Sequence, residues 1–235
     1  MLKYQFDWSV ITSGQYLQWL IDGLWLTLKL SFSACLFALL LGAVIAVLRL
    51  SPLSLLRGFA ASYVEFFRNT PLLIQIFFWY FGAYEILPQS VNDWLNQTNF
   101  EFAAALIALS IYTSAFIAED IRSGVRAISK GQMEAALSQG FGYLAAMRYV
   151  ILPQATRIMV PPLINQFLNA TKNSSLAMTI GVAELTYQAR QIESYSFKGF
   201  EAFSAATLVY VAISLIITAV VTLYSKKILE TRGMA

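Results

Sequence analysis

The sequence predicts an all-α membrane protein with five transmembrane helices, and two observations support this. Hydrophobic residues make up 58% of the 235 residues, charged residues make up only 12%, and the mean hydropathy is +0.61. A soluble domain carries about a quarter charged residues, so a chain this apolar needs a bilayer as its solvent. The apolar residues also form runs long enough to cross a hydrocarbon core of about 30 Å as helices.

Five apolar runs define one transmembrane domain over residues 24–225. Before it, residues 1–23 are rich in Tyr and Trp, whose rings favour the membrane–water boundary, and they lack the pattern of a signal peptide. We expect them to form a periplasmic interfacial segment, and residues 226–235 to form a cytoplasmic tail. The expected spans are 24–48, 59–81, 102–121, 158–182 and 203–224.

The distribution of Lys and Arg predicts the orientation of these spans. Basic residues follow spans one, three and five, whereas the loop 82–101 contains none. The loop 183–202 has only Arg190 and Lys198, beside three glutamates. Because short cytoplasmic loops are enriched in Lys and Arg, we expect the N-terminus outside and the C-terminus inside, with residues 122–157 forming a cytoplasmic loop.

Several classes of function are disfavoured by residues that the chain lacks. It has no His and a single cysteine, Cys35, inside an apolar run, which leaves no disulfide framework and no Cys/His metal site. It also has no basic, aromatic-laced patch for nucleic acid. Without a base beside a nucleophile at helical spacing, we expect no catalytic residue. No Gly-x-x-x-x-Gly-Lys-Ser/Thr phosphate loop is present, so the chain does not bind ATP by that route.

The cytoplasmic loop is expected to contain two short helices joined at glycines. Ser129 and Gln132 have the spacing of a capping box, and Glu134 is expected in the first helical turn. Gly140 and Gly142 can adopt the left-handed backbone that ends a helix. These residues alone are compatible with an amphipathic loop lying on the membrane or with a docking surface for another protein. A second helix is expected over Tyr143–Ile151, and Pro153, Pro161 and Pro162 are expected to break or restart helices.

Spans two and four are unusually polar for membrane helices. Arg68 lies about ten residues into span two, near the middle of the bilayer, where an Arg costs about 2.5–3.5 kcal/mol to insert. It should therefore face protein or water. Arg68 and Lys172 each begin the order cation, Asn, hydroxyl, any residue, Leu, which suggests one cavity that holds a carboxylate. The expected path residues are Arg68, Asn69, Thr70, Pro71, Gln75, Asn165, Asn169, Lys172, Asn173, Ser174 and Ser175.

A structural role remains the alternative for both cations. Each could pair with Glu65, Glu119, Asp120 or a backbone carbonyl, and so set helix packing or gating.

One motif in the cytoplasmic loop resembles a known family. Glu134-Ala135-Ala136, three residues, Gly140, nine residues and then Val150-Ile151-Leu152-Pro153 is similar to the EAA loop of bacterial ABC importer permeases. The resemblance implies the type I ABC importer permease fold, a multi-pass protein of the bacterial inner membrane, and a loop that contacts a cytoplasmic ATPase. The residues expected to couple to that ATPase are Glu134, Ala135, Ala136, Leu137, Gly140, Gly142 and Pro153.

The wider chain resembles the polar amino-acid uptake branch of that family. The segments at residues 63–72 and 172–177 carry this resemblance. The segment 179–185 with Gln188-Ala189, and 66–69 with Trp79-Tyr80, look closest to glutamate/aspartate permeases. Glutamine, or polar amino acids more broadly, is the alternative substrate.

The resemblance also implies a set of partners. Two permease subunits, identical or homologous, would face each other and alternate their access between the two sides of the membrane. A cytoplasmic ATPase dimer would bind ATP and Mg²⁺, no cofactor being bound by this chain. An extracytoplasmic amino-acid-binding protein would deliver the substrate. A passive oligomeric channel is the alternative from a different class.

Overall fold

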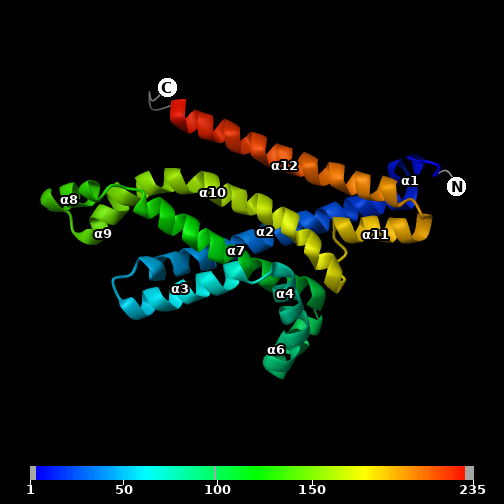
Figure 1. Cartoon of the computed structure of the whole chain (residues 1–235), viewed down its shortest axis with the longest axis horizontal. Helices are drawn as coiled ribbons and strands as arrows, with labels where there is room; N and C mark the ends of the chain where they lie inside the picture. Colours follow the sequence, from blue (N-terminus) through cyan, green and yellow to red (C-terminus); the bar gives the residue numbers. More distant parts are fainter. Residues whose placement is uncertain (1–3, 98, 231–235) are drawn as a thin grey trace. The chain divides into compact units, whose positions relative to one another are not determined.

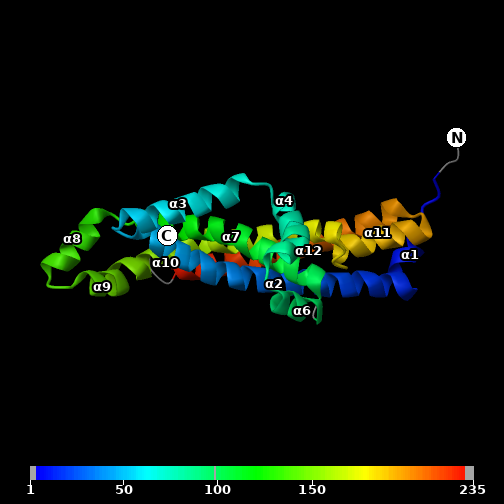
Figure 2. The ribbon, with the colours of Figure 1, turned by 90° about the horizontal axis from the view of Figure 1, so that it is seen from below.

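The computed structural model describes residues 4–97 and 99–230, and in these ranges the chain is helical with connecting turns and contains no strand. Figures 1 and 2 show the course of the chain and its labelled helices. Contacts between residues divide these helices into two compact units. The first contains Met1–Ala34, Leu72–Leu109 and Leu168–Ala235, and the second contains Cys35–Pro71 and Ser110–Phe167. Three helices contribute residues to both units: α2 (Gly14–Leu50), α7 (Phe100–Arg126) and α10 (Leu152–Asn173).

The first unit is built around the pair α11 and α12. Its core contains Leu20 from α2, Leu185 and Ile192 from α11, and small alanines from α12. At Gly23 of α2 an added Cβ would lie 2.9 Å from the Cα of Leu185, so glycine permits this close approach. The other elements of the unit are α1 (Ser9–Thr12), α4 (Leu72–Phe77), a π-helix (Phe78–Gly82), α5 (Ala83–Ile86), α6 (Gln89–Gln97), the 3-10 helix η3 (Ser174–Ile180), α11 (Leu185–Ser196) and α12 (Gly199–Glu230).

The second unit packs α3 (Ser54–Asn69) and its part of α2 around small side chains. Its core includes Ile45, Ala60, Val64 and Ala118. An ion-paired cluster lies in the same unit, where Glu119 of α7 accepts from Arg122 and from Arg49 at the end of α2. The remaining elements are α8 (Lys130–Ser138), α9 (Tyr143–Ala146), a π-helix (Met147–Ile151) and the first part of α10.

Three described helices are long and apolar enough to cross a membrane. They are α2, α7 and α12, and they match predicted spans one, three and five. The helix α2 already begins at Gly14, so the latter part of the expected interfacial segment is helical and continuous with span one. Residues 226–230 continue α12, and the rest of the predicted tail, 231–235, lies outside the described residues, as do residues 1–3. The count of five spans stays a prediction.

The two polar spans are irregular helices. Span two is interrupted at Pro71, because α3 ends at Asn69 and α4 begins at Leu72. Span four is covered by α10 and η3, which end at Gly181 with a positive φ of 91°.

The prediction that prolines break or restart helices is wrong for Pro161 and Pro162, whereas Pro153 does lie where an α-helix starts. Pro153 lies in the first turn of α10, directly after a π-helix, where its missing N–H removes no essential bond. Pro161 and Pro162 lie inside α10, which continues through them. Such interior prolines are tolerated in membrane helices because local adjustments and neighbouring groups satisfy the freed carbonyls.

Helix packing in the second unit predicts opposite effects for two glycine substitutions. A Cβ at Gly42 of α2 would lie 2.7 Å from Ile117 Cγ2 and 2.9 Å from the backbone oxygen of Ser114. We expect Gly42→Ala to lower the stability by about 1–3 kcal/mol through overpacking. Gly58 of α3 has no atom within 4 Å of its added Cβ, so Gly58→Ala should raise the stability by about 0.5–1 kcal/mol. Thermal unfolding of both purified variants in detergent tests this, and equal shifts would contradict the packing described.

Candidate functional site

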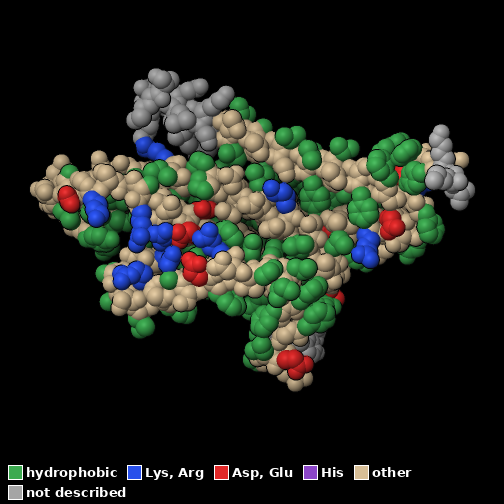
Figure 3. Space-filling model, in the orientation of Figure 1, with side chains coloured by type: hydrophobic (Ala, Val, Ile, Leu, Met, Phe, Trp, Pro, Cys, Tyr) green, Lys and Arg blue, Asp and Glu red, His purple; other side chains and the backbone are tan. Residues whose placement is uncertain are grey.

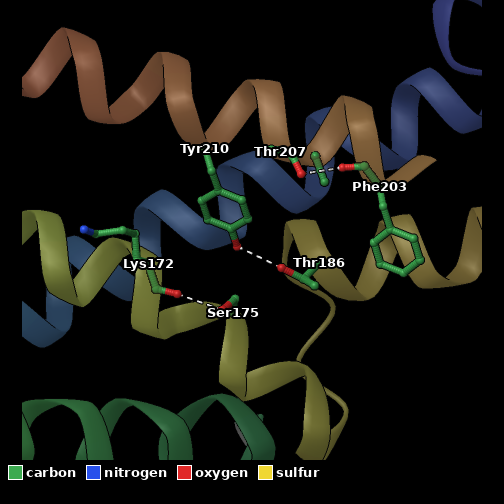
Figure 4. Close-up of a pocket in the computed structure, with 7 residues that line it drawn as sticks. Lys172, Ser175, Thr186, Phe203, Thr207 and Tyr210 are labelled. Carbon is green, nitrogen blue, oxygen red and sulfur yellow. Dashed lines mark hydrogen bonds between the residues drawn. The ribbon is translucent and has the colours of Figure 1, made fainter. Parts of the chain in front are cut away.

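A cavity of about 240 Å³ in the first unit brings together residues from three parts of the chain. Lys172 and Ser175, both predicted path residues, come from the end of α10 and the start of η3. Figure 4 shows them beside α11 and α12, with Tyr210 and Thr186 directed toward one another. The full lining is Lys172, Ser175, Thr186, Phe203, Ala206, Thr207 and Tyr210.

The lining combines one cation with several hydroxyl groups. Lys172 is exposed in the single chain, and the Ser175 hydroxyl donates to the Lys172 carbonyl at 2.7 Å. The Thr207 hydroxyl likewise donates to the carbonyl of Phe203 at 2.7 Å. Both hydroxyls therefore donate their hydrogen atoms to the backbone, but each hydroxyl oxygen can still accept a hydrogen bond from a ligand. An ammonium group and hydroxyls in one cavity suit a small molecule that carries a carboxylate and an ammonium group.

Glu184 holds one of the lining residues, Tyr210, in place through a hydrogen bond. It is fully buried, and the Tyr210 hydroxyl donates to its Oε2 at 2.7 Å. Because that proton points to Glu184, Thr186 is the donor in its 3.1 Å hydrogen bond with Tyr210. Glu184 also caps α11, accepting from the Tyr187 backbone N–H at 2.8 Å. Burial raises the pKa of Glu184, and the donated hydrogen bonds oppose that shift by stabilising its carboxylate.

Sequence reasoning missed Glu184 and the cavity residues of α11 and α12. The sequence places Glu184 in the loop 183–202 and in the segment 179–185 that resembles glutamate/aspartate permeases, but it indicates no role for Glu184 beside a cavity. One local pattern could have indicated its capping role. Glu184 stands shortly after Gly181 and directly before Leu185, the first residue of α11, which is the place of an N-cap residue. The positions of Thr186, Phe203 and Tyr210 depend on the packing of α11 against α12, which no local pattern contains.

The predicted path residues of α10 and η3 divide into exposed and buried groups. Asn165, Asn169 and Lys172 are exposed and follow a helical spacing along α10. Asn173 is partly buried, whereas Ser174 is fully buried and donates to the Thr171 carbonyl at 2.8 Å. The structure therefore presents a polar stripe on α10 and gives Ser174 a structural hydrogen bond.

The predicted path residues around Pro71 make local contacts. The guanidinium carbon of Arg68 lies 5.1 Å from the centroid of the Phe116 ring. The positive charge of Arg68 also interacts electrostatically with the carboxyl group of Asp120. Asn69 donates to the backbone oxygen of Glu65 at 2.7 Å. Thr70 donates to the carbonyl of Phe66 at 2.7 Å, and Gln75 of α4 is buried. Arg68 and Lys172 belong to different units, so their convergence on one cavity stays a prediction.

The predicted coupling loop contains two short helices joined by a left-handed glycine. Gly140 has φ +87°, and its N–H donates to the Leu137 carbonyl at 3.0 Å. The N–H of Phe141 donates to the Ala136 carbonyl at 3.2 Å, which completes a Schellman motif at the end of α8. The expectation for Gly140 is thus confirmed. Gly142 instead has an extended backbone with φ −71° and is the N-cap residue of α9.

Two local predictions for α8 are wrong. Ser129 is the N-cap residue but makes no side-chain capping hydrogen bond, so no capping box forms. The reason is a distant partner, because the Gln132 side chain accepts from Gln154 at 3.3 Å. Glu134 lies beyond the first turn, since α8 begins at Lys130.

The predicted coupling residues are mostly accessible, and large apolar side chains accompany them. Glu134, Ala135, Gly140, Gly142 and Pro153 are exposed, whereas Ala136 is buried. Several large apolar side chains on the same loop are also exposed. These are Leu137 (45%), Phe141 (37%), Tyr143 (60%), Leu144 (81%) and Tyr149 (64%). Such a concentration of exposed apolar side chains is typical of an interaction surface.

No metal centre is visible in the described ranges, where acidic and Cys side chains do not gather in groups of three.

Comparison with known proteins identifies the family. Residues 38–230 match the model of the binding-protein-dependent transport system inner membrane component. The glutamate/aspartate import permease protein GltJ of Escherichia coli (strain K12) is 37% identical over 91% of this chain and 88% of its own length. The probable glutamine ABC transporter permease protein GlnM of Bacillus subtilis (strain 168) is 44% identical over 83% of this chain and 86% of its own.

Solved structures share the fold. The crystal structure of an amino acid ABC transporter with histidines aligns with a TM-score of 0.85 and 34% identity, over 95% of this chain and 100% of the other. The MetNI methionine ABC transporter, in an inward-facing conformation, aligns with a TM-score of 0.72 over 93% of this chain and 99% of the other, at 18% identity. The second likeness concerns the fold alone. From the match over most of its length, the chain belongs to the family of inner membrane components of binding-protein-dependent transport systems.

Proposed function

We propose that this chain is the permease subunit of an ATP-driven importer of polar amino acids, with glutamate and aspartate as the favoured substrates. The observation that carries this proposal is the cavity at Lys172, in which one cation and four hydroxyl-bearing side chains surround a small volume. A carboxylate can accept from the ammonium group, and the hydroxyl oxygens can accept from an amino group. The similarity to the glutamate/aspartate import permease supports an acidic substrate.

Glutamine is the second candidate substrate. The relative named as a probable glutamine permease is 44% identical to this chain. An α-carboxylate is common to glutamate, aspartate and glutamine, so a single Lys172 could recognise all three through that shared group. The side-chain preference must then depend on other residues or on the binding protein.

The proposed mechanism is alternating access driven by a partner ATPase. The chain has no phosphate loop, so the ATP and Mg²⁺ would bind to a cytoplasmic ATPase dimer. The loop of α8 and α9 would dock on that dimer through its exposed apolar side chains. A second permease subunit, identical or homologous, would complete the path, and an extracytoplasmic binding protein would deliver the amino acid. In this arrangement the N-terminus lies outside and the C-terminus lies inside.

The substrate class is tested by ATP hydrolysis in the purified complex with its binding protein. We expect glutamate and aspartate to stimulate hydrolysis most, with glutamine weaker. Stimulation by glutamine alone would transfer the substrate assignment to the second candidate. No stimulation by any polar amino acid would contradict the proposal.

Lys172 is predicted to contribute directly to transport. Lys172→Met removes the only cation among the described residues that line the cavity. The loss of a charge-assisted hydrogen bond worth about 1.5–3 kcal/mol should reduce uptake by about ten- to a hundredfold. Lys29→Met is the matched control, because Lys29 is also exposed in a membrane helix of this unit but lies outside the cavity.

Arg68→Met is measured in parallel for the second predicted cation. Subunit assembly is followed for every variant. Full uptake by assembled Lys172→Met and Arg68→Met variants would show that neither residue serves the path.

Gly140 is predicted to be essential for docking. Gly140→Asp places a side chain at φ +87° and adds a charge to the exposed turn, so the ATPase should no longer co-purify while the permease stays in the membrane. Gly131→Ala is the control, because Gly131 is also exposed on α8, is not one of the predicted coupling residues, and its added Cβ would meet only Ser129 Oγ, at 3.8 Å. Normal uptake by Gly140→Asp would exclude this docking surface.

A further inference from the structure

A second cavity, of about 400 Å³, lies in the second unit and is strongly basic. It is formed where α2 and α7 end, by the turn that follows α2, by α3 and by the first residue of α9. Among the described residues, its lining contains three arginines and no acidic side chain. In Figure 3, Lys and Arg side chains gather on the face of the molecule near the ends of these helices. The lining residues are Arg49, Leu50, Ser51, Pro52, Arg57, Arg126 and Tyr143.

The positive charge of this cavity is only partly balanced within the protein. Arg49 pairs with Glu119 at 3.3 Å, but the same carboxylate also pairs with Arg122. The Nε atom of Arg49 is buried and has no hydrogen-bond partner among the described residues. Arg57 donates to the Ser51 backbone oxygen at 3.4 Å, and within residues 4–97 and 99–230 neither Arg57 nor Arg126 has an ion pair. Glu119 thus pairs with two guanidinium groups, those of Arg49 and Arg122, and the charges of Arg57 and Arg126 are not balanced by an ion pair within the described ranges.

The cavity lies at the ends of two helices that are able to span a membrane. The helices α2 and α7 are both long and apolar enough to cross a membrane. Arg49 is in the last turn of α2, and Arg126 is the last residue of α7. The ends of two spans define the level at which the hydrocarbon core gives way to phosphate groups.

Exposed apolar side chains flank the same turn. Leu53 is 62% exposed, Leu55 is 83% exposed and Phe59 is 63% exposed. These residues follow Pro52 directly and continue into α3. A ligand with a phosphate head and hydrocarbon tails would satisfy both the basic cavity and this apolar border, whereas a small soluble anion would leave the border uncovered.

We propose that this cavity binds a phosphate group, and that the phosphate belongs to the headgroup of an anionic phospholipid. Guanidinium groups of Arg57 and Arg126 bind the phosphate oxygens through charge-assisted hydrogen bonds, and Arg49 offers its unused Nε–H. The acyl chains lie along Leu55 and Phe59. Basic pockets between membrane helices are suited to such headgroups. This site is separate from the Lys172 cavity and does not depend on the identity of the transported amino acid.

The test measures lipid retention by the full chain. The protein is reconstituted into phosphatidylcholine nanodiscs with or without phosphatidylglycerol, and the lipid that stays bound after release is counted by native mass spectrometry. We expect phosphatidylglycerol to be retained in preference to phosphatidylcholine. A double variant, Arg57→Gln with Arg126→Gln, should weaken this retention by about tenfold, since each Arg near an anionic surface contributes to binding. Both residues are exposed, so the variant is expected to fold.

A matched double variant controls for net charge. Lys130→Gln with Arg148→Gln removes the same charge from exposed positions of the same unit outside the cavity, and it should retain the lipid. Equal losses in the two double variants, or equal retention of the two lipids by the natural chain, would overturn the proposal. Inorganic phosphate is added in a separate arm to phosphatidylcholine nanodiscs. The phosphate that stays bound is counted by the same mass spectrometry. If inorganic phosphate is retained as strongly as phosphatidylglycerol, the proposal of a lipid ligand is overturned and the cavity is a site for free phosphate.

Discussion

The structure depends on one constraint, which is that backbone and charged groups inside a bilayer must find partners within the protein. Helices satisfy the backbone, and irregular backbone survives only where protein or a cavity surrounds it. The charged side chains follow the same rule. Glu119 is shared by Arg49 and Arg122, and Glu184 accepts from Tyr210 and from the start of α11. Each carboxylate thereby ties a helix end to its own unit.

Three of the basic side chains to which we assign functions, Lys172, Arg57 and Arg126, line cavities and have no ion pair in the part of the chain that the structure describes. Lys172 is exposed on the polar stripe of α10, beside hydroxyl groups whose oxygens can still accept. Arg57 and Arg126 are exposed at the ends of helices, beside a buried Nε of Arg49. On α8 and α9 the groups without partners are apolar instead of charged, because large apolar side chains such as Leu144 are exposed there. The proposed function requires a polar path inside the membrane and an apolar contact outside it, and these are the residues that we propose for the two roles.

Local sequence patterns predicted the features that depend on local chemistry. The apolar runs of α2, α7 and α12 predicted three helices that can span a membrane. A glycine at the end of a helical run predicted the left-handed residue Gly140. The polar spacing on span four predicted that Lys172 and Ser175 would line a cavity, although their role in transport remains a proposal.

Features that depend on distant contacts could not be predicted in this way. Gln132 bonds to Gln154 rather than completing a capping box, because the chain folds back through α9. Pro161 and Pro162 continue a helix in which soluble-protein rules expect a break. The cavity beside Lys172 is closed by Thr186 and Tyr210, which reach it only through the packing of α11 on α12.

The most direct measurement of the central claim is uptake of labelled glutamate by sealed proteoliposomes that contain the permease, its partner ATPase and the binding protein. The account predicts uptake with ATP on the ATPase side and none with ADP, because the path opens to only one side at a time. Uptake at the same rate without ATP would contradict the account and indicate a passive channel.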